Sequence, residues 1–290
     1  MTDRIDANVW DDTPCDLGEG ILWHPTRHQV FWFDIFARRV LTKEDGRIRD
    51  WAFDEAVSAA GWVDDTRLLI ASETRLFTLD VDSGRTEDVV ALEADDPRTR
   101  SNDGRADPWG GFWIGTMGKL EEDGLGAFWR YYRGELRKIA GGISITNALC
   151  FDRAREVGYW TDTPTAVISR FAVDPKTGWP TGEAEPWLDT SGDAGNPDGA
   201  MTDAEGNIWN ARWGGGRVIC YSPAGEKLRE VLIDGENASC PALGGDRMTT
   251  LFVTSARRGN PAEDALPPPN GMTFAIEDVV EGRPEPQVIL

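Results

Sequence analysis

The residues best placed to do chemistry are polar side chains at the beginning of apolar strands, and the clearest case is Asp198. It belongs to a segment, residues 196–210, that predicts a short loop, a strand, a tight turn and a second strand. Pro197 cannot donate a backbone hydrogen bond and suits the start of a strand, while Gly206 supplies the positive φ that a tight turn needs. We therefore expect Asp198 at the mouth of an innermost strand, where its carboxylate either forms an Asx turn or faces a ligand.

Two further oxygen-bearing side chains have a similar setting. Glu19 lies between Gly18 and Gly20, so the backbone there can approach a ligand closely; an exposed turn glutamate is the alternative. Asn147 interrupts the apolar stretch 142–151, and a buried amide without partners would cost about 1–3 kcal/mol. A structural hydrogen bond or a metal ion that takes the amide oxygen would satisfy it.

Arg100 and Asn102 belong to a polar run, residues 98–104, that leads into another strand. Residues two apart in an extended segment point to the same side, so a cation and an amide would share one face. Such a pair could orient a polyhydroxylated or carbonyl-bearing ligand. A solvated loop is the alternative.

Glu19, Asn147 and Asp198 together offer two charged oxygens and one neutral oxygen, with no thiolate or imidazole. This donor set suits a hard divalent cation such as Ca²⁺, Mg²⁺ or Mn²⁺, with waters completing the shell. Zn²⁺ and Fe²⁺ stay open, although all-oxygen protein ligands are less usual for them. Because the three residues are far apart in sequence, they can meet only if their strands surround a common axis.

The elements that would position these residues are apolar strands that recur about every 40 to 50 residues, the period of propeller blades. They are residues 30–34, 68–71, 112–115, 158–162, 208–210 and 251–254. Six blades of about 45 residues use nearly all of the 290 residues. The sequence therefore predicts an all-β, six-bladed β-propeller that forms a single domain over residues 1–290. Propellers carry their sites where the inner strands open onto the central channel.

Composition limits the partners and the compartment. The formal net charge of −20 repels phosphate backbones and anionic lipid, so we expect no nucleic-acid and no membrane partner. Residues 1–6 lack the apolar segment of a signal peptide. The cysteines show neither metal-ligand spacing nor a dense disulfide framework, and they are Cys15, Cys150, Cys220 and Cys240. We expect a reduced, cytoplasmic protein.

The same polar residues lie in motifs that resemble those of the senescence marker protein, regucalcin and gluconolactonase family of six-bladed propellers. Five motifs, in order from the first blade to the last, carry the resemblance across nearly the whole chain. They are Gly-Glu-Gly-Ile-Leu-Trp at 18–23, Arg-Ser-Asn-Asp-Gly at 100–104 with Trp-Ile-Gly-Thr-Met at 113–117, Thr-Asn-Ala-Leu at 146–149, Pro-Asp-Gly at 197–199, and Leu-Gly-Gly-Asp at 243–246 with Thr-Ser-Ala at 254–256. Ile21 replaces the common Pro and Thr146 the common Ser; neither position touches the proposed chemistry.

The resemblance implies a carboxylic ester hydrolase that opens a sugar lactone to the aldonic acid with one divalent metal ion. It implies Glu19, Asn147 and Asp198 as metal ligands and Asp198 as the catalytic acid or base. It also implies Arg100 and Asn102 as substrate contacts. The sugar lactone, its ring size and the physiological metal stay open.

A further substrate-binding glutamate of some family members has no assigned counterpart. Lys119, Glu121 and Glu122 follow the Gly-Thr-Met segment at a shifted spacing. The role of these three residues stays open.

Other functions remain as alternatives. A non-catalytic calcium-binding protein would use the same ligands but has no need of Arg100 and Asn102, and a metal-dependent esterase acting on other esters is a further enzyme hypothesis. Nucleophilic catalysis is disfavoured, because no Gly-x-Ser-x-Gly elbow is present and the only histidines, His24 and His28, share one early predicted turn.

The two ends of the chain should close the ring. Residues 5–10 and 287–290 are extended and apolar enough to be strands. Because unpaired sheet edges invite aggregation, we expect the amino-terminal strand to pair in the last blade beside residues 272–276 and 287–290. The Pro-rich residues 264–270 predict an irregular surface loop in that blade.

Overall fold

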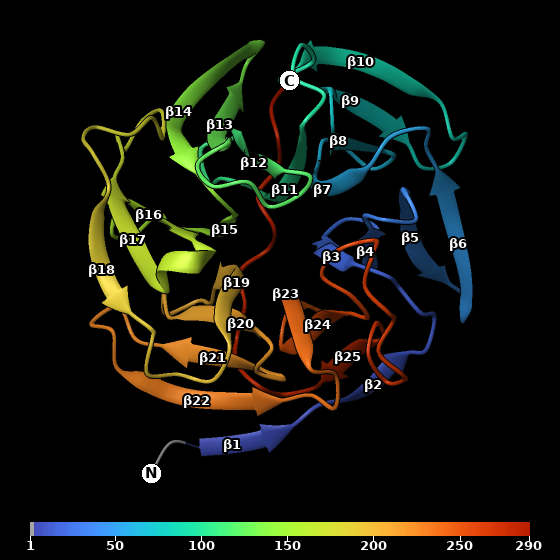
Figure 1. Cartoon of the computed structure of the whole chain (residues 1–290), viewed down its shortest axis with the longest axis vertical. Coiled ribbons are helices and arrows are strands. Elements are labelled where there is room, and N and C mark those ends of the chain that lie inside the picture. Colours follow the sequence, from blue (N-terminus) through green and yellow to red (C-terminus); the bar gives the residue numbers. More distant parts are fainter. Residues whose placement is uncertain (1–2) are drawn as a thin grey trace.

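The predicted six-bladed β-propeller is confirmed by a computed structural model, which describes residues 3–290. Six sheets surround a central axis, and in each blade the strand nearest the axis is followed outward by the next two or three strands in sequence (Figure 1). The first three blades are β3 (Gly18–His24), β4 (Gln29–Asp34), β5 (Arg39–Glu44) and β6 (Arg47–Ala52); β7 (Val57–Trp62), β8 (Arg67–Ser72), β9 (Arg75–Asp80) and β10 (Thr86–Ala91); and β11 (Thr99–Ala106), β12 (Phe112–Gly118), β13 (Gly126–Tyr132) and β14 (Glu135–Ile143).

The second half of the ring completes the fold and takes up the amino-terminal strands. Blade four is β15 (Thr146–Asp152), β16 (Val157–Asp162), β17 (Val167–Ala172) and β18 (Glu185–Asp189), with the short 3₁₀ helix η1 (Thr163–Thr165) after β16. Blade five is β19 (Asn196–Thr202), β20 (Ile208–Trp213), β21 (Arg217–Tyr221) and β22 (Lys227–Leu232), with β1 (Asp3–Asp6) on its outer edge; blade six is β23 (Asn237–Gly244), β24 (Thr250–Ala256), β25 (Thr273–Ile276) and β2 (Asn8–Asp11).

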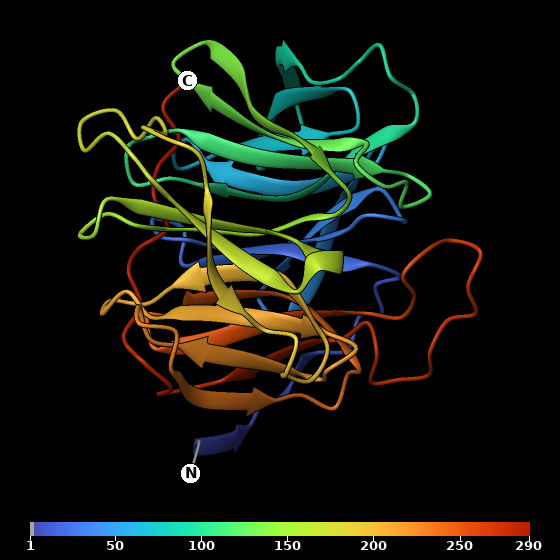
Figure 2. The same cartoon turned by 60° about the vertical axis from the view of Figure 1, so that its left-hand side comes forward.

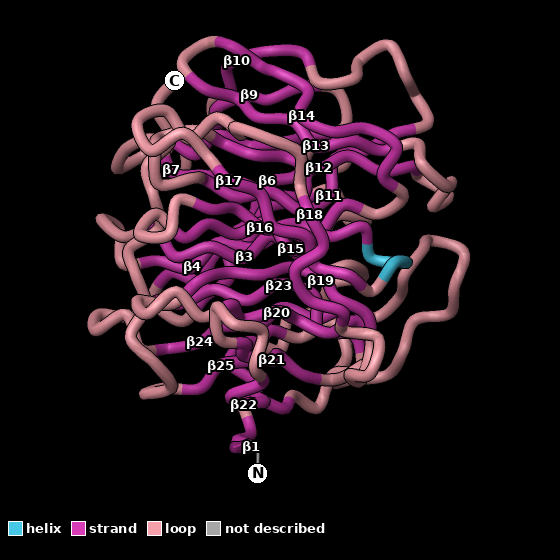
Figure 3. Tube along the Cα trace, turned by 90° about the vertical axis from the view of Figure 1, so that its left-hand side faces the viewer, coloured by secondary structure: helices cyan, strands magenta, loops and turns pink. Residues whose placement is uncertain are grey.

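Strands dominate the ring, and η1 lies at one edge of it (Figure 3). No helix within residues 3–290 has the length and apolar character to cross a membrane. All four cysteines are free and buried.

The apolar strands predicted from the sequence are the second strands of the blades, and their side chains fill the space between neighbouring sheets. Between blades one and two, for example, Phe31 and Phe33 pack with Leu68, Ile70 and Phe77, all at most 1% exposed. Facing sheets interlock in this way around the ring, and the packing holds the inner strands at fixed positions around the axis.

Buried aspartates hold the hairpins between the first two strands of blades three and five. Asp203 Oδ1 accepts the backbone N–H groups of Glu205 and Asn207, and its Oδ2 accepts the indole N–H of Trp209 at 2.9 Å. Asp107 accepts backbone N–H groups and the indole of Trp113 at 2.8 Å in the same manner. The predicted turn at 203–206 is thus confirmed, and a carboxylate ties it to the core.

The amino-terminal closure is confirmed in part. β2 pairs with β25 through Asn8 with Ala275 and Val9 with Phe274, so the chain start completes blade six. β1, however, runs parallel to β22 on the edge of blade five. The sequence did not indicate this second attachment.

The prediction of a closing strand at 287–290 is wrong. After β25 the chain crosses one face of the ring, opposite the long loop at 257–272 (Figure 2). The Val288 N–H donates to Trp62 O at 2.8 Å and the Ile289 N–H to Gly110 O at 2.9 Å. Val288 is 1% exposed and packs between blades two and three. The burial of Val288 at this position replaces strand pairing in blade six, because β2 already occupies the outer edge of that blade.

Candidate functional site

The five site residues predicted from the sequence all line one cavity of about 360 Å³, which we call the axial cavity. Each lies in the first half of an inner strand, so the residues come from the same end of four different blades. They are Glu19 on β3, Arg100 and Asn102 on β11, Asn147 on β15 and Asp198 on β19. The convergence that the sequence argument required is present.

Irregular strand pairing aims these side chains into the cavity. In β3 the register with β4 shifts between Glu19 and Leu22, and in β15 it shifts between Asn147 and Cys150. β19 is irregular immediately at Asp198, and β11 just after Ser101. Such bulges redirect side chains and are common beside functional sites.

The glycines around Glu19 have a different purpose from the one we expected. A Cβ on Gly20 would lie 2.1 Å from Ser58 O, and one on Gly18 would lie 2.4 Å from Ser255 O. Gly20 also has a φ of 56°, a left-handed conformation that glycine adopts without strain. The glycines are therefore needed because strands of the two neighbouring blades, β7 and β24, approach closely, and not to admit a ligand.

Glu19 and Asp198 are buried carboxylates with little compensation from the protein. They are 6% and 4% exposed. Burial, followed by the charge of Asp103, raises the pKa of Glu19; burial, followed by the charges of Glu19 and Asp103, raises the pKa of Asp198 well above its usual value. Arg100 is the cation whose charge opposes both shifts. A cation bound in the cavity would stabilise the ionised form of both carboxylates, which the protein itself compensates poorly.

Each carboxylate has one oxygen held and one available. Glu19 Oε2 accepts the N–H of Gly20 and Asp198 Oδ1 accepts the N–H of Gly199, both at 3.0 Å. Within residues 3–290, no protein donor within hydrogen-bonding distance reaches Glu19 Oε1 or Asp198 Oδ2, and neither oxygen is sealed from solvent. These two oxygens can meet a ligand in the cavity.

A chain of hydrogen bonds orients Arg100, Asn102 and Asn147. Arg100 Nη1 donates to Asn102 Oδ1 at 2.8 Å, and Asn102 Nδ2 donates to Thr146 O at 2.8 Å and to Asn147 Oδ1 at 3.2 Å. The prediction that Arg100 and Asn102 share a face is confirmed. Because the Asn102 amide donates its hydrogen bonds to these neighbours, Asn102 also orients the side chain of Asn147.

The donor set of the cavity fits a hard divalent cation. Asn147 Nδ2 donates to Thr163 Oγ1 at 2.8 Å, which directs the amide oxygen away from Thr163. A carbonyl oxygen has two lone pairs, so the bond from Asn102 leaves one for a metal. No group of three or more His, Cys, Asp or Glu side chains suited to a metal occurs in the part of the chain described. The set here, two carboxylates and one amide, is of another composition and suits Ca²⁺, Mg²⁺ or Mn²⁺.

Two supporting residues were missed in the sequence. Asn210 Nδ2 donates to Asp198 O at 2.7 Å and fixes the backbone that carries the carboxylate. Thr163, on η1, donates its hydroxyl proton to Pro197 O at 2.9 Å while it accepts from Asn147. A buried amide in the apolar run 208–213 was the available signal for Asn210; Thr163 gave none.

The three charged residues after the Gly-Thr-Met segment have distinct positions. Glu121 lines the axial cavity. Lys119 Nζ donates to Glu73 at 2.6 Å, and Glu122 accepts the N–H of Leu120 at 3.0 Å. Glu121 is therefore the one of the three that a bound ligand can meet.

The histidines lie outside the axial cavity. His24 is fully buried at the end of β3, where its Nε2 lies 3.0 Å from Asp64 O, and burial lowers its pKa. This corrects the expectation of a turn residue. His28 lies in the turn and contacts Asp246 at 2.9 Å.

The fold and this cavity define a class of protein: a six-bladed propeller with an oxygen-rich site at one end of its axis. Residues 17–257 match the SMP-30/Gluconolactonase/LRE-like region, and the chain belongs to this family. A Rhizobium meliloti (strain 1021) protein assigned to the sugar lactone lactonases is 37% identical over 99% of both chains. The 6-deoxy-6-sulfogluconolactonase of Pseudomonas putida is 31% identical over 94% of this chain and 95% of its own.

A solved structure shows the same architecture throughout. It is the calcium-binding protein regucalcin from Agrobacterium tumefaciens, which matches with a TM-score of 0.95 and 37% identity over the full length of both chains. The family is one of sugar lactone hydrolases, and its members include a calcium-binding protein.

Proposed function

We propose that this protein is a divalent-metal-dependent sugar lactonase that opens an aldonolactone to the aldonic acid. The observation that carries the proposal is the pairing of two buried carboxylates, each with an available oxygen, with a buried arginine in one cavity of about 360 Å³. Glu19, Asn147 and Asp198 would hold the metal. A divalent cation at this position would polarise the lactone carbonyl and make a bound water more acidic.

The protein's own groups supply proton transfer and orientation. Asp198 Oδ2 is available to accept a proton from the attacking water and to return it to the ring oxygen as the ester bond breaks. Arg100 uses Nη1 on Ser101 O and Asn102 Oδ1, which leaves Nε and Nη2 for the hydroxyl or ester oxygens of the lactone. Its pKa is lowered by burial to about 10, so it stays charged at neutral pH.

The charge of the cavity favours a neutral lactone. Among the residues that the structure describes, its charged lining consists of one cation, Arg100, and four carboxylates, those of Glu19, Glu121, Asp198 and Glu263. A bound divalent cation would leave the site net negative, so a phosphate or sulfonate on the substrate would be repelled. We expect kcat/KM for 6-phosphogluconolactone to be at least tenfold below that for gluconolactone.

The experiment that tests the proposal follows hydrolysis of glucono-, xylono- and arabinonolactone in a pH-stat, corrected for spontaneous hydrolysis. The protein is first treated with a chelator and then supplied with Ca²⁺, Mg²⁺, Mn²⁺ or Zn²⁺. Glu19→Gln and Asp198→Asn should weaken ion binding in calorimetry and remove most of the activity, while the remote Arg137→Gln should change neither. Unchanged ion binding in Asp198→Asn would refute the ligand assignment.

A non-catalytic calcium-binding protein is the second candidate, favoured by the likeness to regucalcin. Arg100→Ala separates the two, because Arg100 is proposed to contact the substrate and not the ion. As an enzyme, the variant should keep its ion affinity and lose about 1.5–3 kcal/mol of transition-state binding, roughly ten- to a hundredfold in kcat/KM. Wild-type protein that binds Ca²⁺ but hydrolyses no lactone would favour the second candidate.

A further inference from the structure

A second cavity, of about 450 Å³, lies at the opposite end of the inner strands; we call it the rear cavity. The axial cavity takes residues from the beginnings of β11, β15 and β19, whereas the rear cavity takes them from the ends of the same strands. At about 3.3 Å per residue, the seven or eight residues of each strand separate the two sites. The rear cavity is therefore distinct from the lactonase site, and its size is in the range of small-molecule pockets.

In the described part of the chain, three arginines and one glutamate are the charged residues of its lining: Arg105, Arg153, Arg283 and Glu285. This excess of positive charge occurs in a protein whose net charge is −20. At physiological ionic strength charges beyond about 8 Å are largely screened, so the local arginines determine what the cavity attracts.

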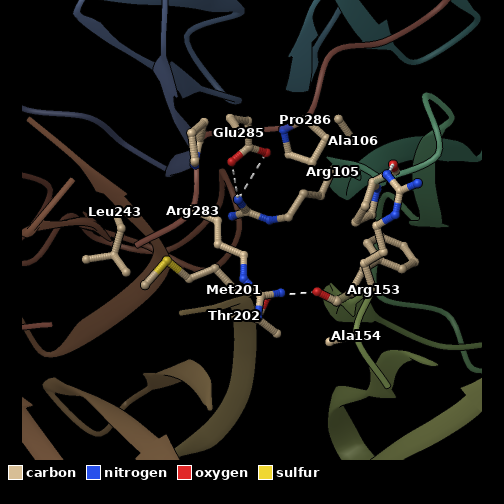
Figure 4. A pocket seen from close by; sticks show the side chains of 13 residues that line it. Arg105, Ala106, Arg153, Ala154, Met201, Thr202, Leu243, Arg283, Glu285 and Pro286 are labelled. Atoms are coloured by element: carbon tan, nitrogen blue, oxygen red, sulfur yellow. Dashed lines mark hydrogen bonds and ion pairs between the residues drawn. The ribbon is translucent and has the colours of Figure 1, made fainter. Parts of the chain in front are cut away.

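The arginines are not equally neutralised. Arg105 Nη1 contacts both carboxylate oxygens of Glu285 at 3.2 and 3.3 Å, as Figure 4 shows. Arg283 donates to Ala204 O at 2.6 Å and lies 3.6 Å from Asp152, a carboxylate that also pairs with a neighbouring arginine.

Arg153 is the least compensated of the three. Its Nη1 donates to Pro108 O at 2.7 Å. Within residues 3–290 no carboxylate lies within ion-pair distance of it. Arg153 is an exposed side chain of the same lining, and the remaining N–H groups of its guanidinium can donate to an anion.

The remaining walls are largely apolar. Phe151, Met201 and Leu243 come from three different blades, and Pro284 and Pro286 come from the carboxy-terminal segment that crosses this face (Figures 2 and 4). An inorganic anion would leave these walls in contact with water. An occupant with both a charge and an apolar body would satisfy the arginines and cover the walls at once.

We propose that the rear cavity binds a small organic carboxylate with an apolar body. Its carboxylate pairs with Arg153, the least compensated arginine, within the positive field to which Arg283 adds, and its hydrocarbon portion packs against Phe151, Met201 and Leu243. The occupant links the carboxy-terminal segment to blades three to six. Binding only to the folded protein, it raises the melting temperature.

The experiment titrates the full-length protein by calorimetry with three probes: octanoate, 1-octanol and inorganic phosphate. Octanoate should bind at one site, and the two other probes at least tenfold more weakly, because each lacks half of the recognition. The double variant Arg153→Gln/Arg283→Gln should bind octanoate at least tenfold more weakly, whereas Arg85→Gln, on an exposed turn far from the cavity, should bind as wild type. Melting temperatures without probe show that each variant is folded.

Four results would overturn the proposal. The first is no octanoate binding up to about 10 mM, because weaker binding is negligible. The second is 1-octanol binding as tightly as octanoate, and the third is octanoate binding to the double variant as tightly as to wild type. The fourth is competitive inhibition of lactone hydrolysis by octanoate, which would place the probe in the axial cavity.

Discussion

Replacement of Trp10 by alanine should show how the ring is closed. Trp10 lies on β2, the strand from the chain start that completes blade six. Its indole meets Phe252 of the same blade edge-on at 5.2 Å and Trp32 of blade one at 5.7 Å. Lys43 Nζ lies 4.8 Å from the ring centre and donates to Trp10 O at 3.0 Å. One side chain therefore bridges the first and last blades.

The expected loss follows from these contacts. Truncating a fully buried tryptophan costs about 3–5 kcal/mol, and the half-buried position of Trp10 places it near the lower end, about 3 kcal/mol. Each edge-on aromatic pair contributes about 0.5–1.5 kcal/mol to this figure. For a chain of this size, an unfolding entropy of about 2.1 cal/mol/K per residue converts the loss into a decrease of about 5 °C in melting temperature.

The assay is urea unfolding and a thermal melt of Trp10→Ala beside Val9→Ala. Val9 is the adjacent residue on the same strand and is 43% exposed, so its loss should cost less than about 0.5 kcal/mol. Two truncated proteins provide a second comparison. Removal of residues 1–6 deletes the exposed edge strand β1, whereas removal of residues 1–11 also deletes β2 and should destabilise the whole ring. Equal stability of the two truncated proteins, or of the two point variants, would refute the idea that β2 closes the propeller.

Three other predictions concern buried groups. Burial raises the pKa of Asp103 to about 6, so the contribution of its protonated carboxyl to stability is present below pH ~3.8 and lost as the pH rises through 6. Asp103→Asn should therefore stabilise the protein by up to about 3 kcal/mol at pH 8 and not at pH 3.5. Equal urea midpoints of the variant and the wild type at pH 8 would contradict this. Glu285→Gln should cost about 3 kcal/mol or more in urea unfolding, because Arg105 would stay buried without a counter-charge. Gly20→Ala, with its Cβ 2.1 Å from a carbonyl oxygen of the next blade, should lower the melting temperature by several degrees, whereas Gly192→Ala, with no atom within 4 Å, should not.

The sequence by itself determined the blades and most of the site. Apolar strands recur at the propeller period, and local patterns such as the turn at 203–206 are set by residues that are neighbours in the chain. Polar residues that interrupt or begin such strands were visible for the same reason. Glu19, Asn147 and Asp198 could be named because each stands out against its own flanking sequence.

Only the tertiary structure decided what depends on neighbouring blades. The glycines beside Glu19 are required by carbonyl groups about 40 and 235 residues away, which no local pattern reveals. Asn210 and Thr163 support the site through contacts between elements. Residues 287–290 are extended in either arrangement, and they bond to blades two and three, with Val288 packed between these blades, while β2 occupies the outer edge of blade six. Sequence patterns specify local conformation, whereas competition for the same edge or the same buried space is resolved only when the ring is complete.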